Sequence, residues 1–252
     1  MQNDEFKTNI NQDLSLIQSV KGLTFGTDAY LLSAFVKKST HARAVDLGSG
    51  TGVIPMLCVA NGKAEKFYAV EVQEKFAEII EKNAEINGFT NKVVPICADL
   101  RNVKSATLGC EVDIVTANPP YMKVDSGKRN EHDEKFIARH EVFGGIDDFC
   151  ACASRILKHS GKFYTVWRPD RLCDLICSLR QYKLEPKRIT FVHATKDSKP
   201  SIVLIQSVKG GASGSIVTRP LFLHYSKEDA KNSILSLDAQ RIYDTCSFDD
   251  FK

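Results

Sequence analysis

The chain has 252 residues, of which 43% are hydrophobic and 26% charged, and its formal net charge is +3. No apolar run approaches the roughly 20 residues that cross a bilayer, which excludes a membrane-spanning segment. The polar start over residues 1–13 lacks the basic and apolar stretches of a secretory signal, so a cytoplasmic protein is expected. None of the eight cysteines forms a CxxC pair, and no metal site is predicted.

The first 40 residues precede the first strong strand signal and form a separate extension. Residues 14–18 and 22–25 are expected to make a small hairpin. A helix should follow it, with Thr27 or Asp28 as its N-terminal cap. This extension comprises residues 1–40, ahead of the main domain.

Short apolar runs then alternate with amphipathic stretches, a pattern typical of βαβ units and a parallel sheet. Five strands are predicted at residues 44–47, 67–72, 93–98, 112–117 and 162–167. Helices are predicted at residues 53–60, 74–87, 146–157 and 171–179. Pro95 places its strand at an edge of the sheet, because proline cannot donate to a ladder.

Two further strands, residues 188–193 and 202–208, are close enough in sequence to pair antiparallel. The fold class is therefore α/β: a Rossmann-like class I methyltransferase sheet of seven mostly parallel strands with an antiparallel edge hairpin. It should occupy residues 41–225. Residues 226–252 read as a polar tail, with a possible helix through residues 234–237 and a loose end.

A glycine-rich turn follows the first predicted strand. It begins two residues after Asp46 and includes Gly48 and Gly50, which let the backbone approach a ligand closely. A third glycine of the dinucleotide fingerprint is missing, because Val53 stands at that position. An acid at the end of this strand suits the ammonium of an amino-acid moiety. These features favour S-adenosylmethionine over a nicotinamide cofactor.

Two more acids end the next two predicted strands. Glu71 is placed to accept hydrogen bonds from both ribose hydroxyls, and Asp99 to meet an adenine amino group. One such acid alone could be a helix cap or a surface charge. Three acids at the ends of three successive strands indicate a cofactor site at one edge of the sheet.

The sequence Asn118-Pro119-Pro120-Tyr121 follows the fourth predicted strand. Methylating an exocyclic amine requires acceptors aimed at its two N–H bonds, since these stabilise the positive charge that develops on nitrogen. The Asn118 side chain and the Pro119 carbonyl can be these acceptors. The two prolines stiffen the loop, and Tyr121 offers a flat face for stacking on a planar substrate. We expect this loop to be catalytic.

These motifs resemble those of the N6-adenine and glutamine methyltransferases that carry an NPPY sequence. Flanking segments narrow the resemblance to the bacterial tRNA1(Val) adenine-37 N6-methyltransferase family. They are residues 14–18, 25–32, 138–141, 168–172, 184–188 and 219–221. The resemblance covers about residues 13–225 and implies adenine 37 of a tRNA as substrate, in its anticodon loop. It also implies that Thr27 and Asp28 lie over the cofactor, beside Asn118, and that Arg139 and His140 lie near the catalytic loop.

The charge distribution supports an RNA substrate. Residues 1–120, 121–212 and 213–252 carry net charges of −2, +6 and −1, so the positive excess begins where the catalytic loop ends. Basic stretches attract a phosphate backbone. The candidate RNA-binding residues are Lys123, Lys128, Arg129, Arg139, His140, Arg168 and Arg171.

Other functions remain open at this point. A protein glutamine N5-methyltransferase shares the loop, but that family usually has a helical N-terminal domain, and only about 40 residues precede the first strand here. A DNA adenine methyltransferase would usually need a target-recognition domain. A non-catalytic RNA-binding module and a nicotinamide oxidoreductase are the alternatives from other classes. A monomer is assumed.

Overall fold

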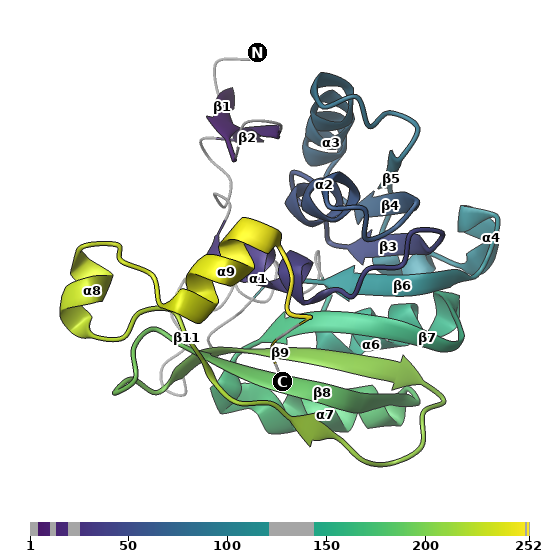
Figure 1. Ribbon diagram of the computed structural model, residues 1–252. Helices are drawn as coiled ribbons and strands as arrows, with labels where there is room; N and C mark the ends of the chain where they lie inside the picture. The colour runs from purple at the N-terminus through teal and green to yellow at the C-terminus, as the bar shows by residue number, and fades with distance from the viewer. Residues whose placement is uncertain (1–4, 11–13, 20–25, 121–143, 250, 252) are drawn as a thin grey trace, which may run out of the picture.

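The computed structural model describes residues 5–10, 14–19, 26–120, 144–249 and 251, drawn in colour in Figure 1. Their largest element is a sheet with the order β10-β8-β9-β7-β6-β3-β4-β5. Its main strands are β3 (Arg43–Leu47), β4 (Lys66–Glu71), β5 (Val93–Cys97), β6 (Val112–Ala117), β7 (Leu157–Trp167), β8 (Leu184–His193) and β9 (Pro200–Lys209). This arrangement confirms the predicted fold class.

The directions of the strands also agree with the prediction. Strands β3 to β7 pair in parallel, and β9 pairs antiparallel with both β7 and β8. Strand β5 with Pro95 lies at the edge. Two short strands were not predicted: β10 (Ile216–Val217) and β11 (Leu221–Phe222) both pair in parallel with β8.

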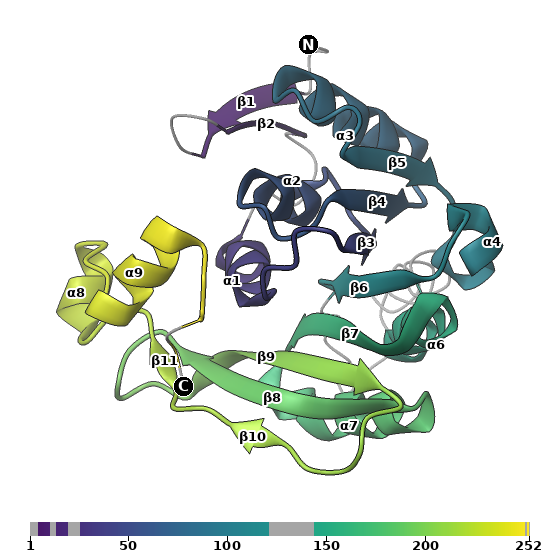
Figure 2. The ribbon, with the colours of Figure 1, turned by 45° about the vertical axis from the view of Figure 1, so that its right-hand side comes forward.

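Helices cover both faces of the sheet (Figure 2). The described helices are α1 (Thr27–Phe35), α2 (Val53–Ala60), α3 (Glu74–Ile86), α4 (Ser105–Leu108), α6 (Ile146–Ile156), α7 (Leu172–Gln181), α8 (Lys227–Lys231) and α9 (Leu237–Thr245), with short 3₁₀ turns η1 (Leu100–Asn102) and η2 (Pro169–Arg171). Successive strand residues face opposite sides: Ala44 joins the core under α1 and α2, and Val45 the core under α6 and α7. None of these helices is long and apolar enough to cross a membrane.

The N-terminal hairpin differs from the prediction. Strand β2 (Ser15–Ser19) pairs antiparallel with β1 (Glu5–Asn9), whereas residues 22–25, its expected partner, lie outside the described residues. The polar sequence of β1 gave no strand signal. The cap of α1 also differs, because Gly26 occupies the N-cap position in place of Thr27 or Asp28.

The C-terminal segment is packed against the domain. The helix expected through residues 234–237 is replaced by α8 and α9, with residues 232–236 between them. The expectation of a loose end is wrong for Phe251, which is 5% exposed and packs edge-on against Phe248. Ala239, Ile242, Cys246, Phe248 and Phe251 of this segment therefore belong to the core, whereas Ile234 and Leu237 are exposed.

Candidate active site

Several of the predicted site residues lie together at the carboxyl edge of the sheet. Strands β3 and β6 are neighbours, and their register pairs Asp46 with Thr116 and Leu47 with Ala117. The next residue on each strand is Gly48 or Asn118, so the glycine-rich loop and the candidate catalytic loop leave the sheet side by side. Strands β4 and β5 lie on one side of this pair and β7 on the other, which makes it the switch point where such sheets bind ligands.

Asp46 is buried, with 1% of its surface exposed. One carboxylate oxygen accepts a hydrogen bond of 2.6 Å from the Thr116 hydroxyl, while the other is buried and has no partner among the described residues. Burial raises the pKa of Asp46 to about 7, although hydrogen bonds from Thr116 and Ser49 oppose the shift. An unpartnered buried carboxylate oxygen fits a cationic ligand group such as an ammonium.

The glycine-rich loop leaves room for a ligand. Gly48 and Gly50 have φ angles of 69° and 54°, in the left-handed region that favours glycine. A Cβ on Gly48 would lie 3.3 Å from the Phe149 ring, so a side chain there would press on α6. At Gly50 a Cβ would meet nothing within 4 Å, which leaves open space above the loop.

Glu71 is held in a fixed orientation. It is 5% exposed, and its two oxygens accept hydrogen bonds of 2.9 Å from the backbone N–H groups of Gly50 and Gln73. A carboxylate has about four acceptor positions, so this one retains capacity for further donors. The arrangement fits the predicted role of accepting from ribose hydroxyls.

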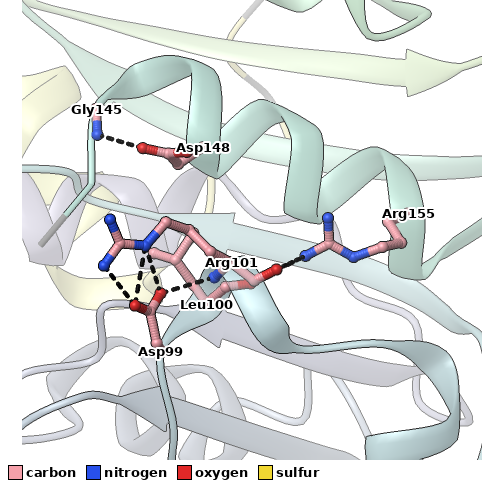
Figure 3. Close-up of polar contacts among 6 residues, drawn as sticks. All are labelled: Asp99, Leu100, Arg101, Gly145, Asp148 and Arg155. Atoms are coloured by element: carbon pink, nitrogen blue, oxygen red, sulfur yellow. Dashed lines mark hydrogen bonds and ion pairs between the residues drawn. The ribbon is translucent and has the colours of Figure 1, made fainter.

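Asp99 has a partner that was not predicted (Figure 3). Its oxygens accept from the Arg101 backbone N–H at 2.9 Å and from the Arg101 guanidinium, whose Nε lies 2.9 Å from each oxygen. The side-chain hydrogen bond from Arg101 lowers the pKa of Asp99. An adenine amino group would therefore have to share Asp99 with Arg101 or displace it.

The turn that follows Asp99 is tied to helix α6. Figure 3 shows Arg155 reaching from α6, and its guanidinium donates to the carbonyls of Leu100 at 3.0 Å and Val103 at 2.8 Å. Sequence reasoning missed Arg155, because its partners are backbone carbonyls far away in the chain. The contact couples the turn at Asp99 to the helix that follows the candidate catalytic loop.

The candidate catalytic loop is described only in part. Asn118 is half-buried at the end of β6, and Pro119 is buried. Several predicted site residues lie outside the described residues: Tyr121, Lys123, Lys128, Arg129, Arg139 and His140. Their predicted roles stay predictions.

Arg168 and Arg171 lie just beyond the carboxyl end of β7, next to β6, on the edge of the sheet where Asn118 lies. Each is paired with an acid. Arg168 bonds Asp170 at 2.6 and 2.9 Å, and Arg171 bonds Asp174 at 2.8 Å. These pairs partly neutralise the two arginines locally. Exposed ion pairs contribute only about 0–1 kcal/mol, so a phosphate could still draw the arginines away.

Asn83 of α3 is a further site residue that the sequence reasoning missed. It is fully buried and donates to the carbonyls of Thr51, at 2.9 Å, and Ile17, at 3.0 Å; its own oxygen accepts from the Ile17 N–H at 2.6 Å. Asn83 thus joins the N-terminal hairpin to the glycine-rich loop. The available signal was a polar residue on the apolar face that Ile79, Ile80 and Ala84 define.

Together, the sheet order and the acids and glycines at its switch point define a Rossmann-like α/β fold of the methyltransferase class. A solved structure of a predicted O-methyltransferase from Agrobacterium tumefaciens has a similar fold, with a TM-score of 0.64 and 22% identity; the match covers 83% of this chain and 98% of that one. The family model of the methyltransferase small domain matches residues 14–177. The chain belongs to this methyltransferase family.

Two relatives are similar over most of their length. The tRNA1(Val) (adenine(37)-N6)-methyltransferase of Porphyromonas gingivalis is 26% identical to this chain, over 71% of this chain and 72% of that protein. The protein with the same name from Phocaeicola vulgatus is 27% identical, over 71% of this chain and 74% of its own.

Proposed function

We propose that this protein is an S-adenosylmethionine-dependent methyltransferase that methylates the exocyclic N6 of adenine in RNA, with adenine 37 of a tRNA as the target. The observation that carries the proposal is the junction of β3 and β6. There the buried carboxylate of Asp46, with one oxygen that has no partner in the described part of the chain, lies on the strand next to the one that leads into Asn118 and Pro119. Asp46 on β3 would then bind the cofactor, and Asn118 after β6 would bind the amine.

The cofactor-binding residues follow from this placement. Asp46 would bind the ammonium of the amino-acid moiety, and Glu71 the ribose hydroxyls. Asp99 lies at the adenine end, and the open space over Gly50 leaves room for the ligand. In the proposed complex, Thr27 and Asp28, in the first turn of α1, cover the cofactor.

The chemistry needs little acid or base catalysis. The bound cofactor supplies an electrophilic methyl group on a sulfonium. The Asn118 side-chain oxygen and the Pro119 carbonyl accept from the two N–H bonds of the amine and direct its lone pair at that methyl group. Transfer would form a C–N bond in place of the cofactor's C–S bond, whose electron pair would stay on sulfur. The proton then leaves nitrogen for water, and Tyr121 would stack on the base.

The names of the two relatives and the basic stretch after Pro120 support tRNA as the substrate. A base in an anticodon loop is already partly unstacked, so extruding it costs less than flipping a base out of a duplex. Arg168 and Arg171 would contact phosphates near the target. The reaction would take place in the cytoplasm, with the protein acting as a monomer.

The proposal is tested by incubating the protein with cofactor labelled in its methyl group and with separate RNA, DNA and protein fractions. We expect label in small RNA, recovered as N6-methyladenosine after digestion. Label recovered as methylglutamine in the protein fraction would replace the RNA substrate with a protein one. The absence of label from all three fractions, with the cofactor bound, would contradict methyl transfer altogether.

A further inference from the structure

Helix α1 begins at the carboxyl edge of the sheet. Its C-terminal end lies at the opposite edge, because Lys63, in the link between α2 and β4, donates to the carbonyls of Ser33, Ala34 and Val36 at 2.7–2.8 Å. Since α1 also packs against α2, its first turn lies beside the start of α2, where the glycine-rich loop ends. Thr27 is therefore placed at the edge that carries the candidate site.

The C-terminal segment runs along α1 from its first turn to its last (Figure 2). At the end of α1, the rings of Phe248 and Phe35 meet edge to face, 5.4 Å apart. Near its start, the rings of Tyr243 and Tyr30 stack 4.6 Å apart at an angle of 13°, and the Tyr30 hydroxyl donates to the Tyr243 carbonyl at 2.6 Å.

The contact between α9 and α1 extends to Thr27, the first residue of α1. The side chains of Tyr243 and Thr27 are hydrogen-bonded to each other. Burial raises the pKa of Tyr243, and the hydrogen bond with Thr27 opposes this shift. This is a second polar contact between α9 and the first turn and a half of α1, beside the one from Tyr30.

Helix α9 is itself anchored firmly enough to act as a support. The Arg219 guanidinium forms a two-point ion pair with Asp238 in its first turn. Ile242 on the same helix and Cys246 directly after it are each 3% exposed. The segment therefore presents Tyr243 to α1 from a fixed position.

We propose that Tyr243 is a positioning residue of the cofactor site: it holds Thr27 and the first turn of α1 in place over the bound cofactor. The C-terminal segment is then part of the cofactor-binding machinery. The inference rests on the proposed function, in which Thr27 and Asp28 cover the cofactor.

The test compares S-adenosylmethionine binding by calorimetry in full-length variants. Tyr243→Ala removes both the stack and the hydrogen bond and should raise Kd about tenfold. Tyr243→Phe keeps the ring and should raise it about threefold. Gln240→Ala is the matched control, because Gln240 is exposed on the same helix and its side chain bonds only Asp244 among the described residues. The Kd of this control should equal that of the wild type. In steady-state assays KM for the cofactor should rise, and kcat at saturation should stay unchanged.

A merely structural role would lower Tm and leave Kd unchanged in the folded protein. An unchanged Kd in folded Tyr243→Ala would overturn the inference. If that variant does not fold, a double-mutant cycle of Tyr243→Phe and Thr27→Val replaces it. The double variant should bind S-adenosylmethionine no more weakly than the weaker-binding single variant. Additive losses of cofactor affinity would refute the coupling between the two side chains. Wild-type protein that binds no cofactor would instead refute the proposed function.

Discussion

Asp46 shows how one buried side chain can link stability to ligand binding. Its pKa, raised from 3.8 to about 7 by burial, lets the folded protein keep a proton that the unfolded chain loses. The contribution of this group to the free energy of unfolding is therefore fully present below about pH 4 and is lost as pH rises through about 7. A ligand cation beside the unpartnered oxygen would offset this loss, because it favours the charged form.

The first prediction is that cofactor affinity depends on pH through Asp46. An ammonium binds the ionised carboxylate, so binding below about pH 7 should release a proton. The affinity should then rise about fivefold between pH 6 and pH 7. Calorimetry in buffers of different ionisation enthalpy measures both quantities. Asp46→Asn should bind more weakly and lose the pH dependence, and a flat wild-type profile would exclude this role.

The second prediction concerns the role of Asn118 in methyl transfer. Asn118→Ala removes one of the two acceptors for the amine and leaves Asp46 and Glu71 intact. Transfer should fall by at least about a hundredfold. The Kd of the cofactor should stay within about twofold of the wild-type value. Single-turnover rates and calorimetry separate the two effects, and wild-type turnover in this variant would remove Asn118 from the mechanism.

Among the elements, the N-terminal hairpin is held to α3 by two asparagine side chains one turn apart. Asn83 bonds Ile17 and the Thr51 carbonyl. Among the described residues, the Asn87 side chain bonds only the Ser15 backbone and the Asn83 carbonyl of its own helix, at 2.7–3.0 Å. Both amides pair with strand backbone as a neighbouring strand would. Only Asn83 continues the contact to the glycine-rich loop.

This difference gives a matched pair of variants. Asn83→Ala leaves buried backbone groups unpaired and should lower the free energy of unfolding by about 3 kcal/mol. It should also weaken cofactor binding. Asn87→Ala should lower the free energy of unfolding by about 1 kcal/mol and leave cofactor binding unchanged. Urea unfolding and calorimetry test both, and equal effects on cofactor binding would rule out the link through Asn83.

The seven main strands of the sheet, β3 to β9, could be predicted because each contains an apolar run that must be buried wherever it lies. The two-residue strands β10 and β11 are too short to give such a signal. Asp46, Glu71 and Asn118 could be predicted to lie near one another, because the carboxyl ends of parallel strands share one edge of the sheet. Strand β1 is polar, so its sequence gave no signal of its pairing with β2. The burial of Phe251 and the pairing of Asp99 with Arg101 depend on side chains whose neighbours no periodicity specifies.

The turn η2 and helix α7 carry a prediction about RNA. The double change Arg168→Ala and Arg171→Ala should reduce the slope of log affinity against log salt by about one to two units, because two phosphate contacts are lost. Filter binding of tRNA at several salt concentrations measures this slope. Arg180→Ala is the control, since Arg180 pairs with Glu185 near the other edge of the sheet. An unchanged slope in the double variant would exclude both arginines.

In the molecule as a whole, both ends of the described chain pack on the face of the sheet that carries α1, α2 and α3. Leu16 of the hairpin and Phe251 near the C-terminus belong to the same hydrophobic cluster as helix α1. The other face is covered by α6 and α7, which follow the candidate catalytic loop in the chain.

The most direct test of the central claim is the formation of N6-methyladenosine in a defined tRNA. Wild-type protein and cofactor are incubated with a tRNA1(Val) transcript that carries adenine 37 and with a matched transcript that carries guanine there, and nucleosides are measured by mass spectrometry. We expect close to one N6-methyladenosine per molecule in the first transcript and none in the second. Equal methylation of both transcripts would contradict the assignment to adenine 37, and methylation of neither would contradict this tRNA as the substrate.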